Sequence, residues 1–166
     1  MHAAVQMSNH LHLVVTDEAS ELDRFMCRFL GPLGRALNGV DATRGQVFER
    51  RYSAIEIIDD GAMLDRIVYT VTNPAAADLV SGADEWPGLC LWPGGREEGT
   101  FERFREPAHT RAVRPAGGEP SRVAADDFRE EAEIRIACPE IAGRRDVRAE
   151  LRRAVQARLE QLGAQR

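Results

Sequence analysis

The sequence contains no lysine, few cysteines and no long apolar run. All 22 Lys+Arg residues are arginine, a bias that a GC-rich genome explains better than selection for phosphate binding does. Cys27, Cys90 and Cys138 lie far apart and form no C-x-x-C pair, which argues against a zinc ribbon or a disulfide scaffold and indicates a reducing, cytoplasmic setting. No apolar segment approaches the roughly 18 to 20 residues that span a bilayer, so we expect no membrane partner.

Positive charge is also scarce. The formal net charge of -5 excludes a strongly basic protein that coats nucleic acid without specificity, so any DNA binding has to be local. The P-loop, G-x-G-x-x-G and G-x-S-x-G motifs are absent, which argues against a nucleotide-binding enzyme and a serine hydrolase. The length of 166 residues predicts one domain with an appendage.

Apolar and polar residues alternate near the N-terminus. Residues 3–15 are predicted to form one half-buried strand, with Val5, Met7, Leu11 and Leu13 on one side and His10 and His12 on the other. An amphipathic helix is predicted to follow from an N-cap at Ser20 to about Asn38, with a kink or break at Gly31-Pro32-Leu33-Gly34. Residues 51–58 alternate again and predict a second strand.

The second half of the chain shows less periodicity. A helix capped by Asp59 or Asp60 is predicted to end at Asn73-Pro74, because a residue before proline resists helical geometry, and a short helical turn is expected as far as Val80. Beyond Gly82, Pro-Gly pairs break up charged segments and indicate an irregular extension. A final amphipathic helix carries an apolar stripe from Val147 to Leu162.

Two groups of residues are candidates for chemistry. His10 and His12 are two apart on a strand, so both imidazoles project from one face and can chelate one cation, although two surface histidines give the same pattern. Tyr69 lies almost opposite the apolar stripe of its helix, with Asp65 and Asn73 four residues away on either side. A tyrosine with an ordinary pKa near 10 needs a nearby cation or base to act as a nucleophile. The alternative interpretations are a surface tyrosine at Tyr69 and a helix N-cap at Asn73.

Together, these residues resemble the single-tyrosine HUH transposases, especially the REP-associated tyrosine transposases. The resemblance covers residues 3 to about 80 and continues weakly at Asp84-Glu85-Trp86-Pro87-Gly88. Its blocks follow the family order: Met7-Ser8-Asn9-His10-Leu11-His12-Leu13, Leu22-Asp23-Arg24-Phe25-Met26, Gly45-Gln46-Val47-Phe48-Glu49-Arg50-Arg51-Tyr52, and Tyr69-Thr70-Val71-Thr72-Asn73-Pro74 with Leu79-Val80.

The resemblance implies an α+β fold with a partial ferredoxin-like antiparallel sheet and helices on one face. Residues 1–83 would form the catalytic core, and 84–166 an irregular C-terminal extension ending in an amphipathic helix. It implies His10, His12 and Asn73 as ligands of magnesium or manganese, and Tyr69 as the nucleophile that cuts and rejoins single-stranded or hairpin DNA through a 5′-phosphotyrosine. The arginines expected to contact DNA are Arg24, Arg28, Arg44, Arg50 and Arg51.

Three departures from the family are visible. Relatives begin with another strand and helix, so we expect an N-terminally truncated core whose exposed sheet edge invites association, for example as a homodimer. Relatives also carry a continuous, more basic helix where this chain has Gly31 to Gly34, and residues 1–80 hold seven arginines against eleven acidic residues. The alternatives are therefore an inactive, decayed or domesticated relative that only binds DNA, and an interaction protein that pairs through this edge.

Overall fold

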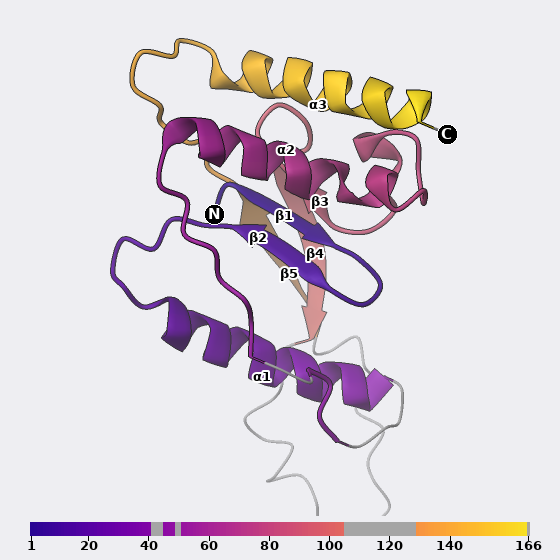
Figure 1. Cartoon of the computed structure of the whole chain (residues 1–166). Coiled ribbons are helices and arrows are strands. Elements are labelled where there is room, and N and C mark those ends of the chain that lie inside the picture. The colour runs from indigo at the N-terminus through magenta and orange to yellow at the C-terminus, as the bar shows by residue number, and fades with distance from the viewer. Residues whose placement is uncertain (41–44, 49–50, 105–128, 166) are drawn as a thin grey trace, which may run out of the picture.

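The computed structural model describes residues 1–40, 45–48, 51–104 and 129–165. Their order is two strands, two helices, a short 3-10 helix, three strands and a helix, which confirms the predicted α+β class with antiparallel sheets (Figure 1). The elements are β1 (Ala3–Gln6), β2 (Leu11–Val14), α1 (Leu22–Val40), α2 (Asp60–Ala76), η1 (Ala83–Glu85), β3 (Cys90–Leu91), β4 (Glu98–Phe104), β5 (Arg129–Arg135) and α3 (Val147–Ala164). No helix in these ranges is long and apolar enough to cross a membrane.

The predicted N-terminal strand is a hairpin. Ser8 and Asn9 form a two-residue turn, closed by the Met7 N–H donating to the His10 carbonyl at 2.8 Å, and Val5 lies opposite His12. Residues directly opposite each other share a face, so Val5 and Met7 lie on the same face as His10 and His12. A single continuous strand was predicted to place the histidines on the face opposite Val5 and Met7, and this prediction was wrong. The two-residue turn folds the second half of the segment back, so that its odd and even positions exchange faces relative to the first half.

Two small sheets follow from the strand pairing. The first has the order β2-β1-β3, in which the two residues of β3 pair with Ala4 and Val5 of β1. The second is a two-stranded ribbon of β4 and β5. The segment predicted to be an irregular extension therefore supplies both a strand of the central sheet and a separate ribbon. Composition concealed these strands because β3 is only two residues long, and β4 and β5 are rich in charged residues that made the segment look like a solvated loop.

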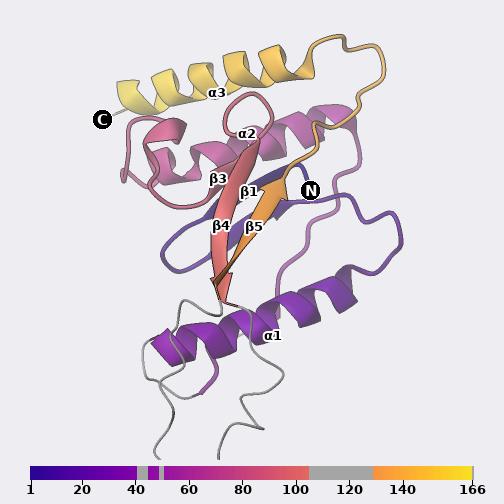
Figure 2. The ribbon, with the colours of Figure 1, turned by 180° about the vertical axis from the view of Figure 1, so that it is seen from behind.

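Helix α1 is continuous, so of the kink or break predicted at Gly31-Pro32-Leu33-Gly34 the break does not occur. Pro32 removes the donor for the Arg28 carbonyl, but Arg28 is exposed, so water can solvate that carbonyl. Ser20 is not the N-cap: it adopts a φ of 54° in the preceding turn, while the Asp17 carboxylate accepts the backbone N–H groups of Glu21 and Leu22. In Figures 1 and 2 the hairpin separates α1 from α2 and α3, so the helices do not share one side as predicted.

Residues 51–58 form no regular element and pair with no strand in the described part of the chain, so the predicted second strand is wrong. The segment connects α1 to α2 (Figure 1). Ile55 and Ile58 are 69% and 84% exposed, and only Ile57 packs against the core. β-branched residues favour strands, but a strand also needs a neighbouring edge, which local sequence does not specify.

Helix α2 carries the candidate tyrosine and is fixed at both ends. The Asp59 side chain caps it by accepting the Ala62 N–H at 2.7 Å. The helix runs through Pro74 to Ala76 and closes with two bonds, Leu79 N–H to the Pro74 carbonyl and Asp78 N–H to the Ala75 carbonyl, with Asp78 at a φ of 58°. The predicted end at Asn73-Pro74 is wrong because burial of Pro74 and Ala75 outweighs the pre-proline bias, and no helical turn continues to Val80.

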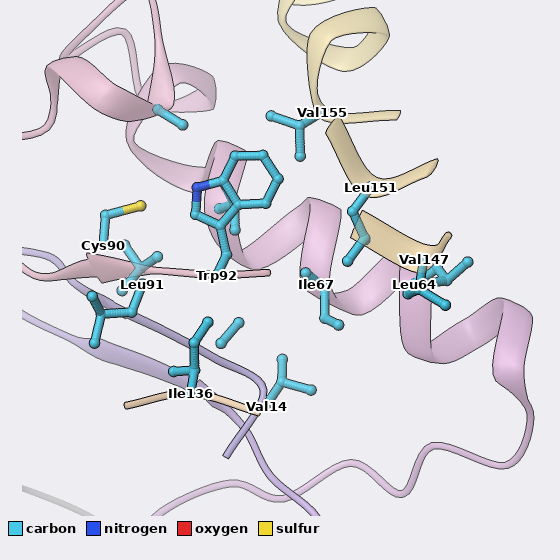
Figure 3. Close-up of a cluster of buried hydrophobic side chains, with 14 of the residues drawn as sticks. Val14, Leu64, Ile67, Cys90, Leu91, Trp92, Ile136, Val147, Leu151 and Val155 are labelled. Carbon is cyan, nitrogen blue, oxygen red and sulfur yellow. The ribbon is translucent and has the colours of Figure 1, made fainter. Parts of the chain in front are cut away.

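The core joins α2, α3 and the central sheet. Figure 3 shows Ile67 of α2 beside Leu151 of α3, with Leu91 on strand β3 and the Trp92 ring projecting from the same segment toward the helices. Helix α3 confirms the predicted terminal helix, and its buried residues Val147, Leu151 and Val155 belong to the predicted apolar stripe. Because α3 packs on α2, it supports from behind the helix that carries Tyr69.

Candidate catalytic site

The fold brings three of the predicted site residues together. His10 and His12 project from the same face of the β1–β2 hairpin, with ring centroids 4.8 Å apart and planes at 89°. Tyr69 on α2 meets the His12 ring edge-on, with centroids 6.0 Å apart and planes at 88°. The histidines and the tyrosine thus come from different elements and share one surface between hairpin and helix.

His12 has an imidazole nitrogen suited to bind a cation. Its Nε2 atom is buried and has no hydrogen-bond partner among the described residues. Burial, and secondly the neighbouring His10, lower the pKa of His12 from its ordinary value. A neutral imidazole keeps a lone pair on one nitrogen, which is the form that binds metal ions. A buried polar atom without a partner is costly, so this nitrogen fits a bound cation.

His10 also keeps one nitrogen available. Its Nδ1 donates to the Asn9 Oδ1 at 2.6 Å, which leaves Nε2 as the acceptor of the ring. His2 provides the contrast, because Nδ1 bonds to the Ala137 carbonyl at 2.7 Å and Nε2 to the Thr16 hydroxyl at 2.8 Å. His2 is therefore a structural histidine that ties the N-terminus to the segment after β5, whereas His10 and His12 each have a nitrogen to spare.

Tyr69 is accessible to a macromolecular substrate. Its side chain is 53% exposed, while Ile67 and Val71 on the same helix are fully buried. The Arg66 guanidinium lies one turn earlier, with Cζ 6.0 Å from the centre of the Tyr69 ring. Arg66 and Asn9 were not predicted as residues of the site. The available signals were the i,i+3 spacing of Arg66 to Tyr69 and the position of Asn9 directly before the first histidine.

No acidic side chain among the described residues joins the two histidines as a third metal ligand. In the described ranges, no group of three or more His, Cys, Asp and Glu side chains could hold a metal ion. Asp65, predicted to share the face of Tyr69, instead lines the groove between α2 and α3 with Arg144 and Glu150. Asn73 lies one turn beyond Tyr69 on α2 and is half-buried, and its role as a ligand stays a prediction.

Two of the predicted DNA-binding arginines form ion pairs with acidic side chains. Arg24 pairs with Glu21 at 2.8 Å, and Arg51 approaches Asp23 at 3.8 Å. Arg28 is exposed on α1, and Arg44 and Arg50 lie outside the described residues. The Tyr52 hydroxyl donates to Asp23, which raises the pKa of Tyr52. These contacts reduce the positive field that the arginines can offer a phosphate backbone.

No family model, no curated protein and no solved structure matches the chain. The fold and the site define an α+β protein with paired histidines on a hairpin, next to a tyrosine on a packed helix.

Proposed function

We propose that this chain is a single-tyrosine endonuclease and strand transferase of the HUH type, acting on single-stranded or hairpin DNA. The observation that carries the proposal is the convergence of Tyr69 with His10 and His12, together with the buried, unpartnered Nε2 of His12. A surface tyrosine and two surface histidines would not require this arrangement. The order of the sequence blocks that resemble the HUH transposases supports the same conclusion.

The reaction conserves the phosphodiester. The Tyr69 oxygen attacks phosphorus, the bond from phosphorus to the 3′ oxygen breaks, and the phenol proton passes through solvent to the departing 3′ oxygen. The products are a 5′-phosphotyrosine and a free 3′-hydroxyl. Because one ester replaces another, a strand bearing a 3′-hydroxyl reverses the attack and restores the tyrosine, so one residue supports cutting and joining.

His10 and His12 would hold a divalent cation, magnesium or manganese, with Asn73 as a third ligand. When bound, the ion supplies positive charge that polarises the phosphodiester and favours the phenolate. Nitrogen ligands favour manganese over magnesium, because magnesium prefers oxygen ligands and retains its water. The chain's own contribution is to place the His12 imidazole beside Tyr69 and the His10 imidazole beside His12, in surroundings whose burial lowers the pKa of His12 and so favours its neutral form.

A covalent-adduct gel tests the proposal. The purified chain is incubated with manganese and labelled single-stranded hairpin oligonucleotides from its own genomic neighbourhood. An adduct is expected that disappears in Tyr69→Phe and His10→Ala. Tyr52→Phe is the matched control, since the chain has 2 tyrosines, and it should keep the adduct. No adduct with any oligonucleotide, or one that persists in Tyr69→Phe, would contradict the proposal.

The acid-paired arginines weaken the hold on DNA that an active enzyme needs, which favours a second candidate function, an inactive relative that retains only some DNA binding. Arg24 and Arg51 each lie beside a carboxylate, and the chain has a net charge of -5. This candidate predicts a mobility shift with hairpin DNA and no covalent product. An interaction protein predicts neither; its contact would use the outer edge of β2, which no strand in the described ranges covers and which could pair two copies.

A further inference from the structure

The turn of the hairpin places a side-chain acceptor next to one of the two candidate ligands. Asn9 Oδ1 accepts the hydrogen of His10 Nδ1 at 2.6 Å, and both groups lie at the tip of the β1–β2 hairpin. From this contact we infer that Asn9 is a positioning residue that selects Nε2 of His10 as the nitrogen offered to a divalent cation. The inference rests on the proposed function and concerns the same site.

The chemical argument concerns tautomers. A neutral imidazole carries one hydrogen, and the hydrogen bond at one nitrogen determines which nitrogen keeps the lone pair. An acceptor at Nδ1 therefore holds the hydrogen there and frees Nε2. In metal-binding histidines, the N–H of the second ring nitrogen commonly donates a hydrogen bond to such an acceptor. This hydrogen bond fixes the orientation of the ring and increases the basicity of the ligand nitrogen. Asn9 supplies this acceptor from the adjacent position in the chain.

The backbone around Asn9 is held firmly enough for such a role. The Met7 N–H bonds to the His10 carbonyl at 2.8 Å and closes the turn. On the other side of β1, the Trp86 indole N–H donates to the Gln6 carbonyl at 2.9 Å, and the Gln6 N–H donates to the Leu89 carbonyl at 2.9 Å. Trp86 also packs against the core. The Trp86-Pro87-Gly88 motif thus anchors the strand that leads into the turn.

The two other described histidines are internal comparisons. His2 uses both of its ring nitrogens in hydrogen bonds, so Asn9 has no influence on its tautomer. His12 lies beside Tyr69, and its buried Nε2 has no hydrogen-bond partner among the described residues. Together, His10 through its Nε2 and His12 through its Nε2 would present two nitrogens from one strand face.

Nitrogen-15 NMR of the full chain without metal tests the inference directly, at an alkaline pH where the imidazoles are neutral. The wild-type His10 is expected as the Nδ1–H tautomer. Asn9→Ala should move it toward the Nε2–H tautomer, Asn9→Asp should retain Nδ1–H, and Ser8→Ala, a change in the same turn, should leave it unchanged. The His2 signals should be the same in all four proteins. A His10 tautomer that Asn9→Ala does not change would overturn the inference.

Manganese titration, followed by the electron paramagnetic resonance of the free ion, supplies the second readout. Asn9→Ala should weaken manganese binding by roughly 10- to 100-fold, while Asn9→Asp and Ser8→Ala stay within a few-fold of the wild type. Equal weakening by Ser8→Ala would assign the effect to the turn and overturn the role of Asn9. A tautomer change without manganese binding in the wild type would support the Asn9 contact and contradict the proposed function, so the two failures are distinguishable.

Discussion

Leu151 of α3 provides a quantitative test of how the helix bearing Tyr69 is supported. Its side chain is fully buried against α2 and the Trp92 region (Figure 3). Truncating a buried leucine to alanine costs about 2 to 5 kcal/mol of unfolding free energy. Leu151 also borders the open groove between α2 and α3, where water can enter the space left behind, so we expect Leu151→Ala to cost about 3 kcal/mol.

Urea denaturation followed by far-ultraviolet circular dichroism measures this cost. With a slope of about 2 kcal/mol per molar urea for a chain of this size, the midpoint should fall by about 1.5 M. Arg153→Ala is the matched control, because Arg153 is exposed on the same helix and arginine and leucine have similar helix propensities. A midpoint for Leu151→Ala equal to that of Arg153→Ala would refute the packing of α3 on α2 as a source of stability.

Three further predictions follow from individual contacts. The bidentate hydrogen bond from Arg148 lowers the pKa of Glu97. The pair therefore stabilises the fold at pH values above the ordinary carboxyl pKa of 4.5. This stabilisation disappears as the pH falls through the lowered pKa of Glu97 in the folded state. Glu97→Gln should lower the melting temperature by roughly 1 to 3 °C at pH 7 and by nothing near pH 2, and an equal difference at both values would contradict this. Burial raises the pKa of the Cys90 thiol to about 11, so iodoacetamide at pH 8 should label exposed Cys27 and spare Cys90 in the folded chain. Mass spectrometry of the peptides measures the labelling, and equal labelling of both cysteines would count against the buried position of Cys90. A Cβ at Gly88 would lie 2.7 Å from Trp86 Nε1, so Gly88→Ala should weaken the indole bond to Gln6 and destabilise the chain by about 1 to 3 kcal/mol in urea, whereas Gly163→Ala, where nothing lies within 4 Å, should not.

Helical periodicity was the reliable part of the sequence signal. The stripe that contains Ile67 and Val71 in α2, and the stripe of Leu151 and Val155 in α3, are both buried as predicted. Element ends were less predictable, because they depend on tertiary contacts. Pro74 lies inside α2 among buried residues, and Pro32 lies inside the continuous helix α1, so neither proline ends its helix where local sequence alone would place the end.

Strand pairing was the part that local sequence did not specify. A continuous alternation around Ser8 and Asn9 fits one strand or a tight hairpin, and only the pairing of Val5 with His12 distinguishes them. Residues 51–58 have strand composition but no partner in the described chain, whereas Cys90 and Leu91 join the sheet without any alternating pattern. Pairing depends on which edges meet, and that is a property of the whole fold.

The candidate site was predicted in its members and only partly in its arrangement. The two-residue spacing predicted that His10 and His12 share a face, and helical geometry predicted that Tyr69 lies away from the buried stripe. Their convergence depends on how the hairpin packs against α2, which spacing alone does not provide. Asn9 and Arg66 were missed because the sequence signals for their contacts with His10 and Tyr69 are weak. An asparagine next to a histidine, and an arginine three residues before a tyrosine, occur on many surfaces.

Mass spectrometry of the tyrosine peptides tests the assignment of Tyr69 as the nucleophile most directly. The chain reacts with hairpin DNA and manganese, the DNA is digested with nuclease, and the mass of each tyrosine peptide is then measured. We expect a nucleotide attached through its 5′ phosphate on the peptide that contains Tyr69, an unmodified peptide at Tyr52, and loss of the modification in His12→Ala. A peptide at Tyr69 that stays unmodified with every hairpin tested, or a modification at Tyr52 instead, would contradict the assignment of Tyr69 as the nucleophile beside a histidine-held cation.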